Sequence, residues 1–149
     1  MRFLNSKQRK QFYKQLHEQY GYDGPREHAV FEGGNDKLYV VNKEIDEVAF
    51  TEMNVIQGGL YVASTQGDDL RLTLDGAMLF GEYCSECFVD VNEAERDVWM
   101  RGENLPYTGN LHGYVLVRYE QRILGCGSVA AEGYIKNYVP KGRRITQPH

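Results

Sequence analysis

Cysteine is the residue type whose spacing first suggests chemistry in this sequence. Cys84 and Cys87 form a C-x-x-C pair, a spacing used by structural zinc sites and by thiol redox proteins. A zinc site needs four ligands and no second C-x-x-C occurs, so Cys126 and His28 or His112 would have to join from distant positions. No βαβ pattern of the thioredoxin type surrounds the pair. We therefore interpret the two cysteines as small residues at a domain junction.

Acidic groups are the second candidates, because two carboxylates can act as a general acid and base. Asp68-Asp69 and the set Glu44, Asp46 and Glu47 lie in polar, turn-like stretches, which favours solvated loops. Gly125-Cys126-Gly127 is a lone G-x-G without the third glycine of a dinucleotide loop, and neither G-x-S-x-G nor G-x-x-x-x-G-K occurs. These patterns argue against catalysis.

The C-terminal stretch carries the most informative binding pattern. Lys141, Arg143 and Arg144 fall within four positions, and Tyr134 and Tyr138 precede them. Arginine forks grip phosphate through two hydrogen bonds, and lysine adds a mobile positive charge. Aromatic rings interleaved with cations can stack on bases. The stretch therefore predicts contact with RNA.

Charge is strongly segregated along the chain. Residues 1–22 carry five basic residues and one acidic residue, and residues 112–149 carry six basic and two acidic ones. Residues 23–111 hold six basic and eighteen acidic residues. If the fold brings the two basic ends to one face, that face would bind a polyanion. We expect Lys7 and Lys10 to share such a patch with the C-terminal cations.

The overall composition predicts a soluble protein with a folded core. The chain has 149 residues, 42% hydrophobic and 26% charged, with a formal net charge of −4. That length suits one ordinary domain or two very small ones. Three cysteines point to a reducing compartment, and no apolar run resembles a signal peptide or a membrane span. We expect a cytoplasmic protein that needs no cofactor and has no membrane partner.

The first half predicts one helix followed by short strands. Asn5 or Ser6 can cap a helix that carries an apolar stripe and stops at Gly21. Two hairpins are expected, over residues 28–41 and 60–74, with a weaker strand at residues 48–50 between them. A short helical segment over residues 75–81 should follow, and we place a domain boundary near residues 81–85.

The second half predicts a small, mostly β unit with one inserted helix. A strand at residues 88–91 precedes a helix capped by Asn92, with Glu95 three residues on, that stops at Gly102. Three further strands are expected over residues 114–119, 123–127 and 134–138. Many short strands with few helices indicate the α+β class.

Several motifs of the second half resemble one family. They are Trp99-Met100-Arg101-Gly102-Glu103-Asn104-Leu105-Pro106, Gly113-Tyr114-Val115-Leu116-Val117, Ile123-Leu124-Gly125-Cys126-Gly127 and Lys136-Asn137-Tyr138-Val139-Pro140-Lys141-Gly142-Arg143-Arg144. Together they are similar to a PUA-type RNA-binding domain, above all the C-terminal PUA-like domain of the Nol/Nop/Sun (Fmu) rRNA 5-methylcytosine methyltransferases. The first half more loosely resembles the domain that precedes the PUA module in Nip-type ribosome-biogenesis proteins.

The resemblance implies a fold, a division into domains and a set of RNA-binding residues. It implies an N-terminal α/β domain over residues 1–83 and a C-terminal PUA-type β pseudobarrel over residues 84–149. In such pseudobarrels the helix, the glycine loop after it and the last strand bind RNA. By motif match, the RNA-binding residues would be Arg101, Gly102, Lys136, Lys141, Arg143 and Arg144. Glycine at position 102 would let an RNA backbone approach closely.

Two departures from the family limit what is carried over. Ser128 stands where those domains commonly have a lysine, which removes one candidate phosphate contact. The chain is too short to contain the methyltransferase catalytic domain, so we expect no methyl transfer from it.

The resulting prediction is a non-catalytic protein that binds structured rRNA or tRNA in ribosome biogenesis or RNA modification. Its partners would be RNA and an RNA-modifying enzyme or ribosome-assembly factor. One alternative is a small PUA-like hydrolase or metal-dependent enzyme that uses Cys84, Cys87 or the acidic pairs. The other is an adaptor whose acidic middle docks a basic ribosomal protein.

Overall fold

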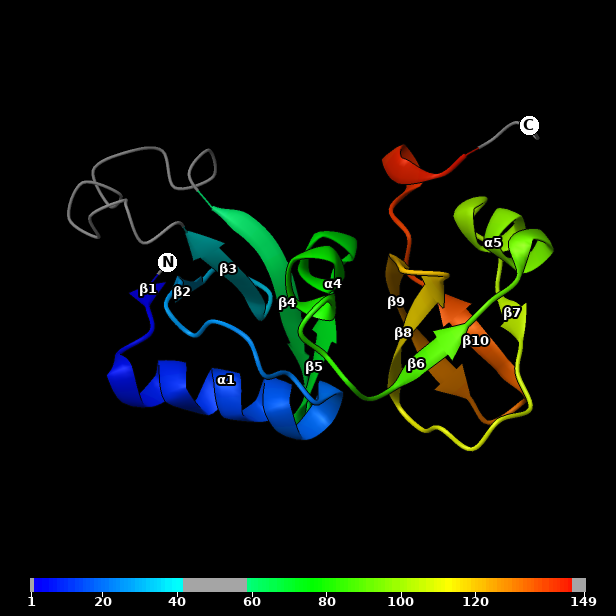
Figure 1. The fold of residues 1–149 in the computed structure, drawn as a ribbon. Coiled ribbons are helices and arrows are strands. Elements are labelled where there is room, and N and C mark those ends of the chain that lie inside the picture. The colour runs from blue at the N-terminus through cyan, green and yellow to red at the C-terminus, as the bar shows by residue number, and fades with distance from the viewer. Residues whose placement is uncertain (1, 42–58, 146–149) are drawn as a thin grey trace.

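The computed structural model describes residues 2–41 and 59–145. It contains two five-stranded sheets, one built from residues before position 73 and one from residues after position 87 (Figure 1). The strand expected at residues 48–50 and the acidic set Glu44, Asp46 and Glu47 lie outside the described residues. No helix in the described ranges is long and apolar enough to cross a bilayer.

Helix α1 (Ser6–Tyr20) begins and ends at the residues that the sequence predicts. Asn5 accepts a hydrogen bond from the Gln8 backbone N–H, and the Gln8 side chain accepts one from Asn5. Gly21 closes the helix in the left-handed region, with φ of 68°. Because Phe12, Leu16 and Tyr20 recur at four-residue spacing, they bury one face of the helix against the first sheet.

The first sheet is antiparallel throughout and has the order β1-β2-β3-β4-β5. Both predicted hairpins are confirmed, and Gly67 supplies the positive φ of 62° in the second turn. Helix α4 packs on β4 and β5, and its cap Thr73 accepts a hydrogen bond from the Gly76 N–H at 2.9 Å. The bounds are β1 (Arg2–Phe3), β2 (Ala29–Glu32), β3 (Lys37–Val41), β4 (Leu60–Gln66), β5 (Asp69–Leu72) and α4 (Leu74–Gly81).

The second sheet has the order β6-β8-β9-β10-β7 and curls around a separate core, consistent with a PUA-type pseudobarrel. Strands β6 and β8 run parallel, and the other pairs are antiparallel. The indole of Trp99, fully buried on α5, donates to the Leu124 carbonyl at 2.9 Å. The bounds are β6 (Phe88–Asp90), α5 (Glu93–Met100), β7 (Leu105–Pro106), β8 (Tyr114–Tyr119), β9 (Arg122–Ala130), β10 (Tyr134–Asn137) and the 3-10 helix η1 (Lys141–Arg143).

A further core cluster, to which both sheets contribute, joins the two sheets in addition to the core inside the second one. Leu116 on β8 and Cys126 on β9 are buried in the same cluster as Val62 and Leu72 of the first sheet. The Tyr20 hydroxyl donates to the Leu70 carbonyl at 2.5 Å and lies 3.9 Å from the Cys126 sulfur. One face of the β8–β9 pair is therefore buried against the N-terminal part of the protein.

The connecting segment, residues 82–87, is tied to the end of α1. The backbone N–H groups of Ser85 and Glu86 donate to the Tyr20 carbonyl at 3.3 and 3.2 Å. The Cys87 thiol donates to the Gln19 carbonyl at 3.0 Å, and Cys87 itself has a positive φ of 67°. The predicted boundary at residues 83–84 falls in this segment, which the hydrogen bonds hold in place.

Because the core is shared, the protein should unfold as one unit. We expect Leu116→Ala to lower the free energy of unfolding by about 2–5 kcal/mol, as for other buried leucines. Trp99 fluorescence and far-ultraviolet circular dichroism should shift together in a urea titration. Leu60→Ala, at a leucine that is 41% exposed on β4, is the matched control and should have a small effect. Two separated transitions would contradict the shared core.

Candidate nucleic-acid interface

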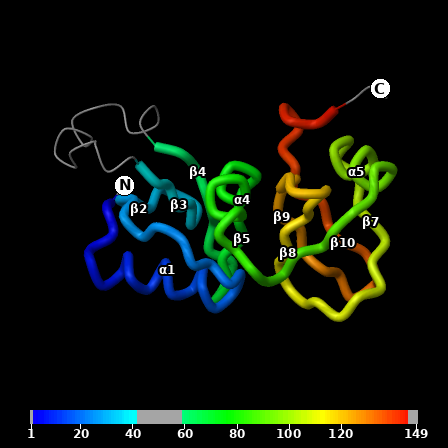
Figure 2. Tube along the Cα trace, viewed as in Figure 1, coloured from blue at the N-terminus to red at the C-terminus, as the bar shows by residue number. Residues whose placement is uncertain are grey.

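Half of the predicted RNA-binding residues lie on residues 136–145, the end of β10 and the segment that follows it, which we call the C-terminal strap (Figure 2). Asn137 anchors its start, since its side-chain amide donates to the carbonyls of Trp99 and Glu103 at 2.8 and 2.9 Å. The Ile145 N–H donates to the Met100 carbonyl at 2.8 Å and anchors its end. The strap is thereby fixed against the end of α5.

Gly102 and Arg144 meet beside this anchor. Gly102 has φ of 91°, and a Cβ atom built on it would collide with the Arg144 side chain. The Arg144 Nε donates to the Val139 carbonyl at 3.0 Å, which holds the guanidinium over the glycine. The space above Gly102 therefore holds a cation from the strap, and close approach of an RNA backbone to Gly102 stays a prediction.

The predicted cations divide into paired and unpaired sets. Arg101 pairs with Glu103 at 2.9 Å, and Arg143 pairs with Asp75 of α4 at 3.0 Å. Within residues 2–41 and 59–145, no carboxylate lies within ion-pair distance of the other three cations of the strap: Lys136, Lys141 and Arg144. These three keep their full charge for an anionic ligand.

The two N-terminal cations do not join this group. Lys7 and Lys10 lie on the first turns of α1, which Figure 1 and Figure 2 place at the opposite end of the molecule from η1. Lys7 lines a groove beside α1 together with Gln8 and Gln11. The expectation of one patch shared by both basic ends is wrong, because α1 leads away from the strap.

A cluster that the sequence did not reveal lies where the first sheet meets the strap. The Arg71 guanidinium of β5 lies 4.7 Å from the centre of the Tyr138 ring, and the Lys136 Nζ lies 5.4 Å from the same centre. The Tyr114 ring is 6.4 Å away from that of Tyr138. The sequence did not indicate Arg71 as a binding residue, because it lies in an ordinary alternating strand. Only the packing of the two sheets brings it to Tyr138.

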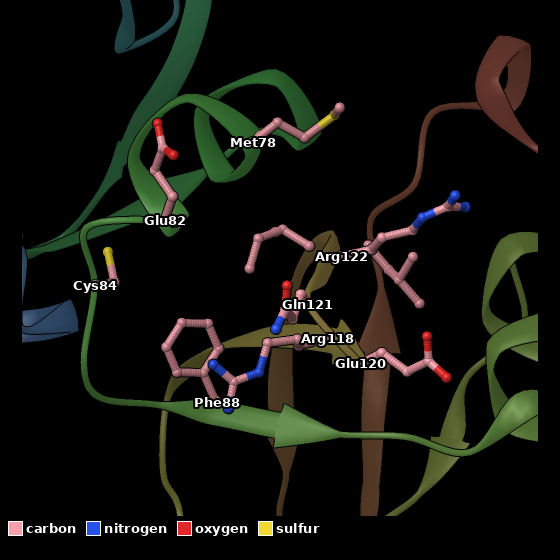
Figure 3. Close-up of a pocket in the computed structure, with 11 residues that line it drawn as sticks. Met78, Glu82, Cys84, Phe88, Arg118, Glu120, Gln121 and Arg122 are labelled. Carbon is pink, nitrogen blue, oxygen red and sulfur yellow. The ribbon is translucent and has the colours of Figure 1, made fainter.

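A pocket of about 820 Å³ opens at the other end of the β8–β9 pair (Figure 3). Met78 of α4 and Glu82 directly after that helix line the pocket on one side, and Arg118 and Gln121 line it from the β8–β9 hairpin. Arg118 lies 3.8 Å above the Phe88 ring and forms hydrogen bonds of 2.6 and 3.1 Å to Asp90. These hydrogen bonds hold the pKa of the Asp90 carboxyl below its usual range, so the pair stays charged.

Cys84, which lines this pocket, and the nearby Cys87 are both hydrogen-bond donors. The Cys84 thiol donates to the Phe80 carbonyl at 3.3 Å, as the Cys87 thiol does to Gln19. Burial raises the pKa of Cys84 to about 12 and also raises that of Cys87, which disfavours the thiolates needed for metal binding or nucleophilic attack. In the part of the chain that the structure describes, no three His, Cys, Asp or Glu side chains are placed to hold a metal ion.

The curled sheet, the inserted helix and the glycine loop are consistent with a PUA-like domain, and such a domain suggests RNA binding. Residues 88–145 match the family model described as the methyltransferase RsmF PUA domain. The match confirms the resemblance to the C-terminal domains of the Sun/Fmu methyltransferases. The matched family model describes the PUA domain and not a catalytic domain. Among curated proteins, none matches the chain.

The raised pKa of Cys84 should be visible as slow alkylation. At pH 8 an ordinary thiol with a pKa of about 8.5 is partly thiolate, whereas Cys84 stays neutral. We expect iodoacetamide to modify Cys84 about a hundredfold more slowly in the folded protein than in urea, as measured by peptide mass spectrometry. Because the folded pKa is the higher one, the stability from this thiol is complete below about pH 8.5 and is lost as pH rises towards 12. Equal rates would make Cys84 a nucleophile candidate again.

The contact between Gly102 and Arg144 predicts a stability effect. Gly102→Ala combines a positive φ with a collision and should lower the free energy of unfolding by about 1–3 kcal/mol. Gly142→Ala, on the same strap but with no neighbouring atom within 4 Å, is the matched control and should stay within about 0.5 kcal/mol of the parent. Urea titrations measure both, and equal losses would contradict the packing described.

Proposed function

We propose that the chain is a non-catalytic RNA-binding protein that acts on structured rRNA or tRNA in the cytoplasm, in ribosome biogenesis or RNA modification. The observation that carries this proposal is a PUA-like domain whose strap presents three cations without carboxylate partners among the described residues. Such cations attract phosphates and release the counterions condensed on RNA. The contact surface is the strap with the Arg101–Gly102 loop.

The two paired arginines can also reach RNA. Arg101–Glu103 and Arg143–Asp75 are partly exposed ion pairs, and pairs of that kind contribute only about 0–1 kcal/mol. A phosphate that approaches the strap can therefore replace the carboxylate at little cost. On this proposal all the cations of the strap and the loop contribute to one interface.

The remaining parts of the proposal concern partners. The N-terminal part, with its looser resemblance to the domain that precedes the PUA module, would support the interface, and a separate enzyme or assembly factor would supply any chemistry. Lys7 and Lys10 would make a second contact, distinct from the strap. The adaptor alternative is favoured by the eighteen acidic residues of positions 23–111, which suit a basic protein partner.

Removing the unpaired lysines should weaken RNA binding. We expect Lys136→Gln with Lys141→Gln to lower affinity for bulk tRNA and bulk rRNA, and to reduce the slope of log K against log salt by about two. Lys14→Gln is the matched control, because Lys14 is exposed on α1 and pairs with Glu18 at 3.8 Å. Filter binding at several salt concentrations measures both variants.

The outcomes separate the candidate functions. Loss in the double variant but not in Lys14→Gln supports the strap as the interface, and the preferred RNA is the one bound more tightly at high salt. An unchanged slope would contradict the proposal. A partner that stays associated in extract after nuclease digestion would support the adaptor instead.

A further inference from the structure

Two cations from different sheets contact one tyrosine, Tyr138, where β5 meets the C-terminal strap. We call this junction of Arg71, Lys136 and Tyr138 the seam. Arg71 belongs to β5 of the first sheet and Lys136 to β10 of the second, and both lie over the Tyr138 ring. Tyr138 is itself held by a contact of 3.1 Å between its hydroxyl and the Ser128 Oγ. At the seam, two positively charged side chains therefore contact one half-buried ring whose position is fixed by a hydrogen bond.

Among the described residues, two other arginines lie over aromatic rings in the same way, but each pairs with a carboxylate. Arg96 lies 4.7 Å from the Tyr119 ring centre and pairs with Asp97 and Glu93 at 2.9 and 3.6 Å. Arg118 over Phe88 pairs with Asp90. By contrast, no carboxylate of the described residues, Asp69 on the same strand included, forms an ion pair with Arg71 or Lys136.

We infer that Arg71 and Lys136 both bind the phosphate backbone of the RNA, so that the interface extends from the PUA-like domain across the seam onto β5. The inference rests on the proposed function, because it names a further contact of the same surface. Phosphates have several acceptor oxygens, which suit both the arginine fork and the lysine charge. The ring holds both side chains in place, because a cation–π contact contributes about 0.5–1 kcal/mol at such sites.

The strap connects this contact to the rest of the interface. Its first residues place Tyr138 beside Arg71 of β5. Its later residues reach α4, where Arg143 pairs with Asp75 and lies 4.0 Å from the Met78 sulfur. The strap thus follows the N-terminal part over two successive elements, β5 and α4. An RNA backbone that follows the strap would therefore also pass Arg71.

The test compares Arg71→Gln with Arg96→Gln in the full chain. Both variants remove an arginine that lies 4.7 Å from a tyrosine ring centre, so both lose the same ring contact, but only Arg71 is unpaired. With bulk tRNA and fragmented rRNA as probes, we expect Arg71→Gln to weaken binding about tenfold at low salt and to reduce the salt slope by about one. Arg96→Gln should match the parent, and Arg71→Lys should retain the slope.

The possible results test the seam contact separately from the proposed RNA-binding function. If the parent protein binds and Arg71→Gln binds equally well with the same slope, the seam contact is overturned while the strap interface stands. If Arg96→Gln loses as much as Arg71→Gln, the effect is one of overall charge and the inference is also overturned. If the parent binds neither probe in a salt-dependent way, the proposed function fails and takes the seam contact with it.

Discussion

Burial of one face of the β8–β9 pair against the N-terminal part is the constraint on which the rest of the structure depends. Leu116 and Cys126 complete a core that begins with the apolar face of α1, and the connecting segment is held by carbonyls at the end of that helix. The PUA-like domain therefore does not hang from a flexible linker. Its sheet has a fixed orientation relative to β5 and α4, and this orientation decides which side chains meet at the seam.

The position of the C-terminal strap follows from that packing. Asn137 and Ile145 fix its two ends to α5, while Tyr138 and Arg143 contact β5 and α4 of the other part. The strap is the segment that carries most of the candidate RNA-binding cations. The interface is thus a property of the assembled core: a change that loosens Leu116 would disturb cations that lie far from it in the sequence.

Local signals predicted the elements well, and contacts between elements are where the sequence failed. The caps at Asn5 and Asn92 and the glycines of the turns act within a few residues, so they can be recognised in a string of letters. The cation cluster of the strap could be found for the same reason. Whether Lys7 lies near that cluster depends on the direction of α1 in the folded protein. The fact that both segments are basic does not determine that direction. The contact of Arg71 with Tyr138 depends on how the two sheets pack, and the position of Arg144 over Gly102 depends on how the strap packs against the end of α5. No local pattern in the sequence reports either.

A net charge of −4 is compatible with RNA binding when the charges are placed in this way. The Debye length is about 8 Å at physiological ionic strength, so a phosphate at the strap experiences mainly the cations beside it. On the proposed function, the described acidic residues that lie away from the strap would repel RNA. That repulsion would not weaken a well-placed contact, but it would disfavour other orientations of the RNA. The acidic excess would therefore favour a docking orientation in which the strap and the seam face the phosphates.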